Sequence, residues 1–167
     1  MSLEEFKNKT WQTPVAKDIS QEQLQRLIDI LDIDDFQTVI IVNTASECGF
    51  TRQYADLQKF YNDNKDNGLL VVAQPSNNFG QQEPGEDNEI KEFCNTNFGV
   101  TFPILPKADV VNENSTELYN LLAEITGQRP MWNFHKYIIS KKLNKLISTN
   151  HFNEIDERFI NDVKATL

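Results

Sequence analysis

Two β-branched, almost continuously apolar segments constrain the fold of this chain more than any other feature. Residues 38–45 read TVIIVNTA and residues 69–73 read LLVVA. Uninterrupted apolar runs of this length are typical of strands that are buried on both faces of a parallel or mixed sheet. Between them, apolar residues recur at helical spacing from about Thr51 to the helix stop signal Asn67-Gly68. The pattern predicts a β-α-β unit with a right-handed crossover.

The segments on either side of this unit predict further helices and strands. Ser20 and Gln23 have the spacing of a capping box, so we expect a short helix over residues 21–31. A polar loop from Pro75 to Gly85 precedes the second half of the chain. We expect there a helix capped by Asp87, with Ile90, Phe93 and Cys94 on one face, followed by a strand over residues 100–105 and a helix over residues 115–126. Two antiparallel strands should follow over residues 133–139 and 143–149, joined across Lys141-Lys142. A last helix is marked by Ile155, Phe159, Ile160 and Val163.

This order, β-α-β followed by β-β-α, predicts an α/β chain with a thioredoxin-like fold. Its central mixed β-sheet would be flanked by helices and would carry an extra α/β insertion. Residues 1–37 constrain the fold least, since Phe6, Trp11 and Val15 indicate only an entry segment before the first helix. A length of 167 residues, with 39% hydrophobic and 25% charged residues, fits a single folded domain spanning residues 1–167.

Charge and hydropathy exclude several classes of partner. The formal net charge of -9 would repel a phosphate backbone, so we expect no binding to nucleic acid. No apolar stretch approaches the roughly 20 residues that cross a bilayer, so we expect no membrane anchor. The first eleven residues are polar and charged, whereas a signal peptide needs an apolar region there. A cytoplasmic location is the resulting expectation.

The two cysteines, Cys48 and Cys94, are too few for a disulfide framework. They are also too few for a structural zinc site, even if His135 and His151 are counted. Their separation does not match a C-x-x-C dithiol. In a reducing compartment, two cysteines of this kind are either chemically inert or take part in a reaction.

Cys48 is expected between the carboxyl end of a strand and the amino end of a helix. Exposed N–H groups and the helix dipole favour an anion at such a place, which for cysteine is a thiolate. The neighbouring Glu47 would oppose this effect and Arg52 would support it. From position alone, a buried and inert cysteine is an equally good interpretation.

The residues on either side of Cys48 favour a reactive cysteine over an inert one. The segment VNTASECGFT (42–51) resembles the strand-to-helix signature of the glutathione peroxidase family, in which selenocysteine or cysteine stands at the position of Cys48. Further along, NNFGQQEPG (77–85) resembles the family's N-Q-F-G-x-Q-E-P-G loop, and NEIKEFC continues it. GVTFP (99–103) and the W-N-F motif at residues 132–134 follow in the same order. Four ordered motifs at compatible spacing make this resemblance specific.

Carried over by motif, the resemblance implies that Cys48 is the peroxidatic residue and that Gln82, Trp132 and Asn133 complete a catalytic tetrad. A thiolate that attacks a peroxide oxygen expels an alkoxide or hydroxide, so the site needs preorganised donors. The two amides and the indole N–H are such donors. Taken singly, Trp132 could be a core aromatic residue and Gln82 a solvated loop residue. No metal or organic cofactor is implied, because sulfur carries both electrons.

Cys94 has a plain interpretation as an apolar core position on its helix. Cysteine-using, thioredoxin-dependent members of the family often carry a second cysteine there, and the resemblance implies that Cys94 resolves the sulfenic acid of Cys48 by forming a disulfide. Because a disulfide needs Cα atoms roughly 4.4 to 6.8 Å apart, a more distant Cys94 would require its helix to unwind in part.

The connection from Ile125 to Trp132 is short, whereas tetrameric, glutathione-using relatives carry a long loop there. The resemblance therefore implies a monomer that uses thioredoxin rather than glutathione. The substrate would be hydrogen peroxide or an organic or lipid hydroperoxide. Two alternatives are a peroxide sensor that oxidises a partner protein and a non-catalytic thioredoxin-fold binding module.

Overall fold

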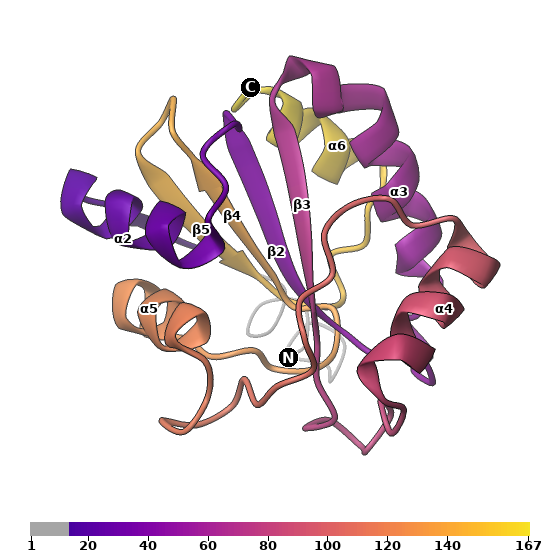
Figure 1. The fold of residues 1–167 in the computed structure, drawn as a ribbon. Coiled ribbons are helices and arrows are strands. Elements are labelled where there is room, and N and C mark those ends of the chain that lie inside the picture. Colours follow the sequence, from indigo (N-terminus) through magenta and orange to yellow (C-terminus); the bar gives the residue numbers. More distant parts are fainter. Residues whose placement is uncertain (1–13) are drawn as a thin grey trace, which may run out of the picture.

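The computed structural model describes residues 14–167, so Phe6 and Trp11 of the expected entry segment lie outside the described residues (Figure 1). Its elements in chain order are β1 (Val15–Asp18), α2 (Gln21–Leu31), β2 (Thr38–Thr44), α3 (Gln53–Asn64), the 3-10 helix η1 (Lys65–Asn67), β3 (Leu69–Pro75), α4 (Asp87–Phe98), α5 (Glu117–Thr126), β4 (Lys136–Ser140), β5 (Lys145–Thr149) and α6 (Glu157–Lys164). None of the helices between residues 14 and 167 is long and apolar enough to cross a membrane.

A five-stranded mixed sheet with the order β1-β5-β4-β2-β3 forms the centre of the structure. β2 and β3 pair in parallel through α3, which confirms the expected β-α-β unit. The β2–β4, β4–β5 and β5–β1 pairs are antiparallel. Every residue of β2 and β3 is buried, as their continuous apolar runs indicate.

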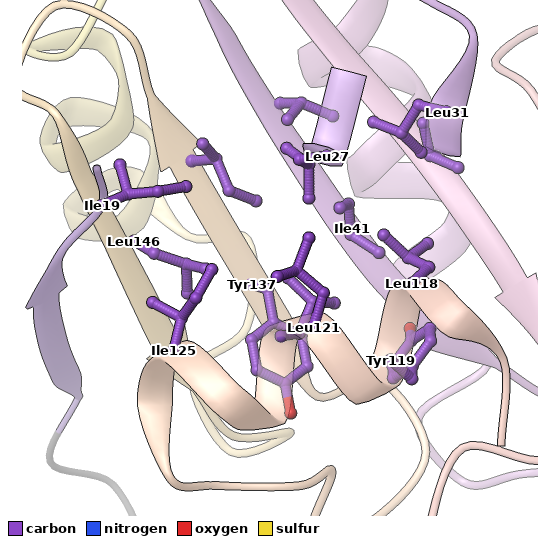
Figure 2. Close-up of a cluster of buried hydrophobic side chains, with 14 of the residues drawn as sticks. Ile19, Leu27, Leu31, Ile41, Leu118, Tyr119, Leu121, Ile125, Tyr137 and Leu146 are labelled. Atoms are coloured by element: carbon purple, nitrogen blue, oxygen red, sulfur yellow. The ribbon is translucent and has the colours of Figure 1, made fainter. Parts of the chain in front are cut away.

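Helices cover both faces of the sheet and form two hydrophobic cores. One core packs α2 and α5 on the sheet, and Figure 2 shows Leu27, Leu121 and Tyr137 meeting within it. The other packs α3, α4 and α6 on the opposite face, where Tyr54, Ile90 and Phe159 are buried. Figure 1 shows the two sets of helices on opposite sides of the strands. This arrangement is the thioredoxin-like fold that the sequence predicted.

Local signals account for the element ends that were predicted well. Ser20 and Gln23 form a capping box, and α2 spans the expected residues 21–31. The turn before β3 depends on Gly68, whose φ of 97° favours glycine. A Cβ atom at Gly68 would lie 2.8 Å from the Cβ of Gln37, so this turn has no room for a side chain.

The prediction of a strand over residues 100–105 is wrong. The structure has only an isolated parallel bridge between Ala73 and Ile104 there, at the edge of β3. Pro103 and Pro106 explain the difference, because proline has no N–H to donate to a ladder. The backbone N–H of Thr101 is satisfied by the Gln58 side chain instead, at 2.9 Å.

The strand expected from residue 133 starts later, at Lys136. Phe134 has a φ of 66° and therefore belongs to a turn rather than to extended backbone. Three other elements start at slightly different residues than predicted. The N-cap of α4 is Glu86 instead of Asp87, and Thr116 caps α5, which starts at Glu117. β5 starts at Lys145, after the turn residue Asn144. No pattern in the sequence indicated that β1 pairs with β5.

The side chain of Lys136 on β4 is fully buried, and its Nζ atom has no hydrogen-bond partner. Burial lowers the pKa of this ammonium group to about 7, against a smaller opposite effect of Glu154. Between pH 7 and the ordinary lysine value of about 10.4, the unfolded chain binds more protons than the folded one. Lys136 therefore costs stability near neutral pH, and this cost shrinks as the pH rises.

We expect Lys136→Met to raise the free energy of unfolding at pH 7 by about 1 to 4 kcal/mol, because an unpaired buried charge is replaced by an apolar chain of similar volume. The gain should be smaller at pH 9. Urea unfolding at both pH values, with the exposed Lys91→Met as control, measures it. A variant that is less stable than the wild type at pH 7 would contradict the assignment.

Candidate active site

Cys48 lies in a tight turn between the end of β2 and the start of α3. The hydroxyl of Thr51 organises this turn: it donates to the carbonyl of Ala45 at 2.8 Å and accepts from the backbone N–H of Cys48 at 2.9 Å. The backbone N–H of Thr51 also donates to the carbonyl of Cys48 at 3.1 Å. The expected position between strand and helix is confirmed, although α3 itself begins only at Gln53.

The sulfur of Cys48 is half-buried and accepts a hydrogen bond from the backbone. The N–H of Phe50 donates to Sγ at 3.3 Å. A backbone donor held by a turn stabilises negative charge on the atom that it points to. Cys48 is a free thiol, and it packs against the hydrophobic core beneath α3 and α4.

Arg52 was expected to support negative charge at Cys48, but its guanidinium is engaged elsewhere. It donates to the carbonyl of Gly49 and pairs with the carboxylate of Glu154 at 2.5 Å. These contacts join the Cys48 turn to the segment after β5. The effect of Arg52 is therefore to hold the turn in place.

Gln82 and Asn133, far apart in the sequence, are in direct contact. The amide Nδ2 of Asn133 donates to Oε1 of Gln82 at 2.9 Å. Asn133 is fully buried, and its own Oδ1 has no hydrogen-bond partner. The backbone N–H of Glu47 donates to the carbonyl of Gln82 at 3.0 Å, which attaches the Cys48 turn to the same loop.

Trp132 is the neighbour of this pair. A Cβ atom built on Gly80 would lie 3.3 Å from Nε2 of Gln82 and 3.3 Å from the indole carbon Cη2 of Trp132, so both side chains flank Gly80. The ring of Phe79 lies 5.4 Å from that of Trp132. The structure thus brings Gln82, Trp132 and Asn133 together.

Asn43, near the end of β2, holds the turn that carries Trp132 and Asn133, and the sequence analysis missed it. Its Nδ2 donates to the carbonyl of Trp132 at 2.9 Å, and its Oδ1 accepts from the N–H of His135 at 3.1 Å. Its backbone carbonyl accepts from the N–H of Phe134 at 2.6 Å. A buried asparagine within the apolar run of residues 38–45 was the available signal, because buried polar groups require partners.

Cys94 lies inside α4 and is fully buried, as its position beside Ile90 indicated. It is also a free thiol. Burial raises the pKa of this thiol, and the Tyr54 hydroxyl next to it has the opposite effect. The apolar core containing Cys94 is the one against which Cys48 packs.

Glu83, next to Gln82, is a second residue that the sequence analysis missed. The residue is 1% exposed, and its Oε2 atom has no hydrogen-bond partner. Burial raises the pKa of the carboxyl, while the Ser46 hydroxyl and backbone N–H and the Lys107 ammonium act in the opposite direction. No cluster of three or more His, Cys, Asp or Glu side chains suited to a metal ion occurs from residue 14 onward.

Solved structures support the class to which this fold belongs. The chain resembles the "Crystal structure of Trgpx in apo form" with a TM-score of 0.58 and 29% identity, over 78% of this chain and 80% of that one. A DsbF homologue from Corynebacterium diphtheriae shares the fold with a TM-score of 0.55 at 17% identity, over 83% of this chain and 76% of that one. The chain is therefore a thioredoxin-fold protein.

Sequence comparisons give the family. The model described as "Glutathione peroxidase" matches residues 17–123, which include both cysteines and Gln82. "Glutathione peroxidase-like peroxiredoxin gpx1" of Schizosaccharomyces pombe is 38% identical over 135 residues, 78% of this chain and 85% of that protein. "Hydroperoxy fatty acid reductase gpx1" of Synechocystis is 42% identical over 120 residues, 65% of this chain and 71% of that protein. The chain belongs to the glutathione peroxidase family, and it is a peroxidase.

Gly80→Ala should lower peroxidase activity about tenfold, because the added methyl would push Gln82 and Trp132 apart. It should also cost about 1 kcal/mol of stability, since the φ of 65° at Gly80 disfavours a side chain. Gly127→Ala is the matched control, with a φ of 69° and open space around its Cβ. Equal activity of the two variants in a peroxide consumption assay would contradict a role for the Gly80 contacts.

Proposed function

We propose that this peroxidase reduces hydroperoxides through nucleophilic attack by Cys48. The observation that carries the proposal is the turn at Cys48, where a backbone N–H points at a half-buried sulfur. The same turn is attached to the loop of Gln82, which contacts Asn133. A half-buried sulfur that accepts from a backbone N–H suits attack on a peroxide better than it suits a passive core position.

The proposed reaction breaks the peroxide O–O bond. The Cys48 thiolate attacks one oxygen and becomes a sulfenic acid, while the other oxygen leaves as hydroxide or alkoxide and takes up a proton. The Gln82 and Asn133 amides and the Trp132 indole N–H are the groups available to stabilise the leaving oxygen. Asn133 is buried, and its Nδ2 atom donates to Oε1 of Gln82, so the two amides are held in place relative to each other.

In the second step, Cys94 attacks the sulfenic acid of Cys48, and a disulfide forms with release of water. The shared core supports this pairing, because Cys48 packs against the cluster that contains Cys94. Cys94 lies within α4 and is fully buried. Local opening of α4 would accompany disulfide formation and would expose the disulfide to a protein reductant.

Hydrogen peroxide and organic or lipid hydroperoxides are the substrates that we propose. Cys48 is half-buried and, like Phe50, packs against an apolar core, so an apolar substituent on the peroxide would meet apolar neighbours there. One relative carries the name hydroperoxy fatty acid reductase, which is consistent with such a substrate. We further propose that the protein acts as a single-domain monomer in a reducing compartment such as the cytoplasm, where both thiols stay available.

One equivalent of peroxide should convert the reduced protein into a form with a Cys48–Cys94 disulfide. Peptide mass spectrometry detects this as the loss of two hydrogens across the two cysteine peptides. Cys48→Ser should abolish peroxide consumption, and Cys94→Ser should accumulate oxidised Cys48. Recovery of only overoxidised Cys48 from the wild type would contradict the second step. A specific mixed disulfide of Cys94→Ser with one cellular protein would favour a peroxide sensor instead.

Thioredoxin should support faster turnover than glutathione. The connection between α5 and Trp132 is short, whereas tetrameric, glutathione-using relatives carry a long loop there. Steady-state peroxide consumption, with each reductant supplied in turn at saturating peroxide, measures the difference. We expect at least a tenfold larger kcat/KM with thioredoxin. Faster turnover with glutathione would overturn this choice of reductant.

A further inference from the structure

A chain of buried hydrogen bonds runs from the residue before Trp132 to strand β5, and the proposed reaction uses no part of it. The backbone N–H of Met131 donates to Nδ1 of His135 at 3.3 Å. Nε2 of the same ring lies 2.7 Å from the Ser148 hydroxyl, which donates to Oε1 of Gln128 at 2.5 Å. His135 is fully buried, and Ser148 is buried as well. Buried polar groups whose partners are all present hold one geometry.

These contacts fix the position of the proton on the His135 ring. A carbonyl oxygen only accepts, so the single hydrogen of the Ser148 hydroxyl points to Gln128. The hydroxyl therefore accepts from Nε2 of His135, and Nδ1 carries no hydrogen because it accepts from Met131. Burial, and to a smaller extent the charge of Lys136, lowers the pKa of His135 to about 3. The ring therefore stays neutral, in one tautomer, at physiological pH.

Gln128 belongs to the short connection between α5 and Trp132, and it has further contacts of its own. Its backbone carbonyl accepts from the Tyr137 hydroxyl at 2.7 Å, and its Nε2 atom lies 3.5 Å from Sδ of Met131. Tyr137 and Ser148 are paired residues of β4 and β5. The connection is therefore held against the sheet at both Gln128 and Met131.

Trp132 lies between two fixed points of the backbone. On its carboxyl side, Nδ2 of Asn43 donates to the carbonyl of Trp132 at 2.9 Å. On its amino side, the N–H of Met131 is held by the His135 ring. The backbone N–H of His135 donates to Oδ1 of Asn43 at 3.1 Å, so one residue joins both points. The direction of the indole depends on the backbone on both sides, so loss of the imidazole contact would let it turn.

We propose that the His135 imidazole positions Trp132 for the reaction at Cys48 by holding the N–H of Met131. This inference rests on the proposed function, because it takes the indole N–H as a donor to the leaving oxygen. His135 acts only through the backbone before Trp132, and it exchanges no proton during the reaction. A donor whose direction is fixed beforehand stabilises developing charge without reorganising.

Three substitutions at His135 separate the hydrogen bond from the ring. His135→Asn places Oδ1 where Nδ1 stands, so it keeps an acceptor for Met131 but loses the ring that lies 5.0 Å from the Tyr137 ring. His135→Phe keeps a ring of similar size and loses the acceptor. His135→Gln keeps a donor for Ser148 and also lacks the acceptor, so it serves as a second, polar variant.

Two measurements are made on each variant. The rate constant of Cys48 oxidation by hydrogen peroxide reports the reaction, and the NMR resonance of the Trp132 indole N–H reports the surroundings of the indole. The chain has two tryptophans, so Trp132→Phe identifies the resonance by its loss. Thr38→Val is the control, because it removes a buried hydroxyl that contacts Thr166 at the start of β2.

We expect His135→Phe and His135→Gln to slow the oxidation of Cys48 about tenfold and to shift the indole resonance. His135→Asn should stay within about threefold of the wild type and keep the resonance in place. Thr38→Val should change neither quantity. His135→Asn loses the packing of the ring, so in urea it should unfold no later than His135→Phe. A merely structural role would therefore make His135→Asn at least as slow as His135→Phe.

Three results would overturn the inference. The first is an indole resonance that does not move in His135→Phe and His135→Gln. The second is a wild-type rate in both variants alongside a slow Trp132→Phe. The third is an equal loss of rate in His135→Asn, or in Thr38→Val. By contrast, a wild-type rate in Trp132→Phe would overturn the donor role of Trp132 in the proposed function, and the resonance would still show whether His135 holds the indole.

Discussion

The hydrogen bonds around the carboxyl end of β2 determine the geometry on which the candidate site depends. Asn43 holds the turn of Trp132 and Asn133 through its side chain and its backbone carbonyl. A few residues later, the N–H of Glu47 attaches the Cys48 turn to the Gln82 loop. β2 is buried on both faces and paired on both edges, so three loops are fixed to a central strand of the sheet.

Much of the fold follows from local signals in the sequence. The apolar runs of β2 and β3, the capping box at Ser20 and the stop at Gly68 each specify one conformation, and the structure agrees with them. The predicted strand over residues 100–105 is absent because Pro103 and Pro106 cannot donate to a ladder, although the β-branched and aromatic residues beside them favour extended backbone. The edge strand β1 was missed because its four residues make sense only when paired with β5.

The candidate site was predictable to the extent that it follows from motifs. Motif order named Cys48, Gln82, Trp132, Asn133 and Cys94, and the structure brings three of them together and buries the fifth in the core that Cys48 touches. Spacing alone says nothing of tertiary burial, so Asn43, Tyr54 and Glu83 were not foreseen. Each of these three matters because the fold removes it from water, and a polar side chain without water needs partners within the protein.

A double-mutant cycle on the first oxidation step tests the central claim that Cys48, Gln82 and Asn133 form one peroxidatic site. The quantity is the second-order rate constant of Cys48 oxidation by hydrogen peroxide in wild type, Gln82→Ala, Asn133→Ala and the double variant. We predict that each single variant loses at least tenfold and that the double variant loses little more, because Asn133 donates to Gln82. Rate constants equal to the wild type in all three variants would contradict the account.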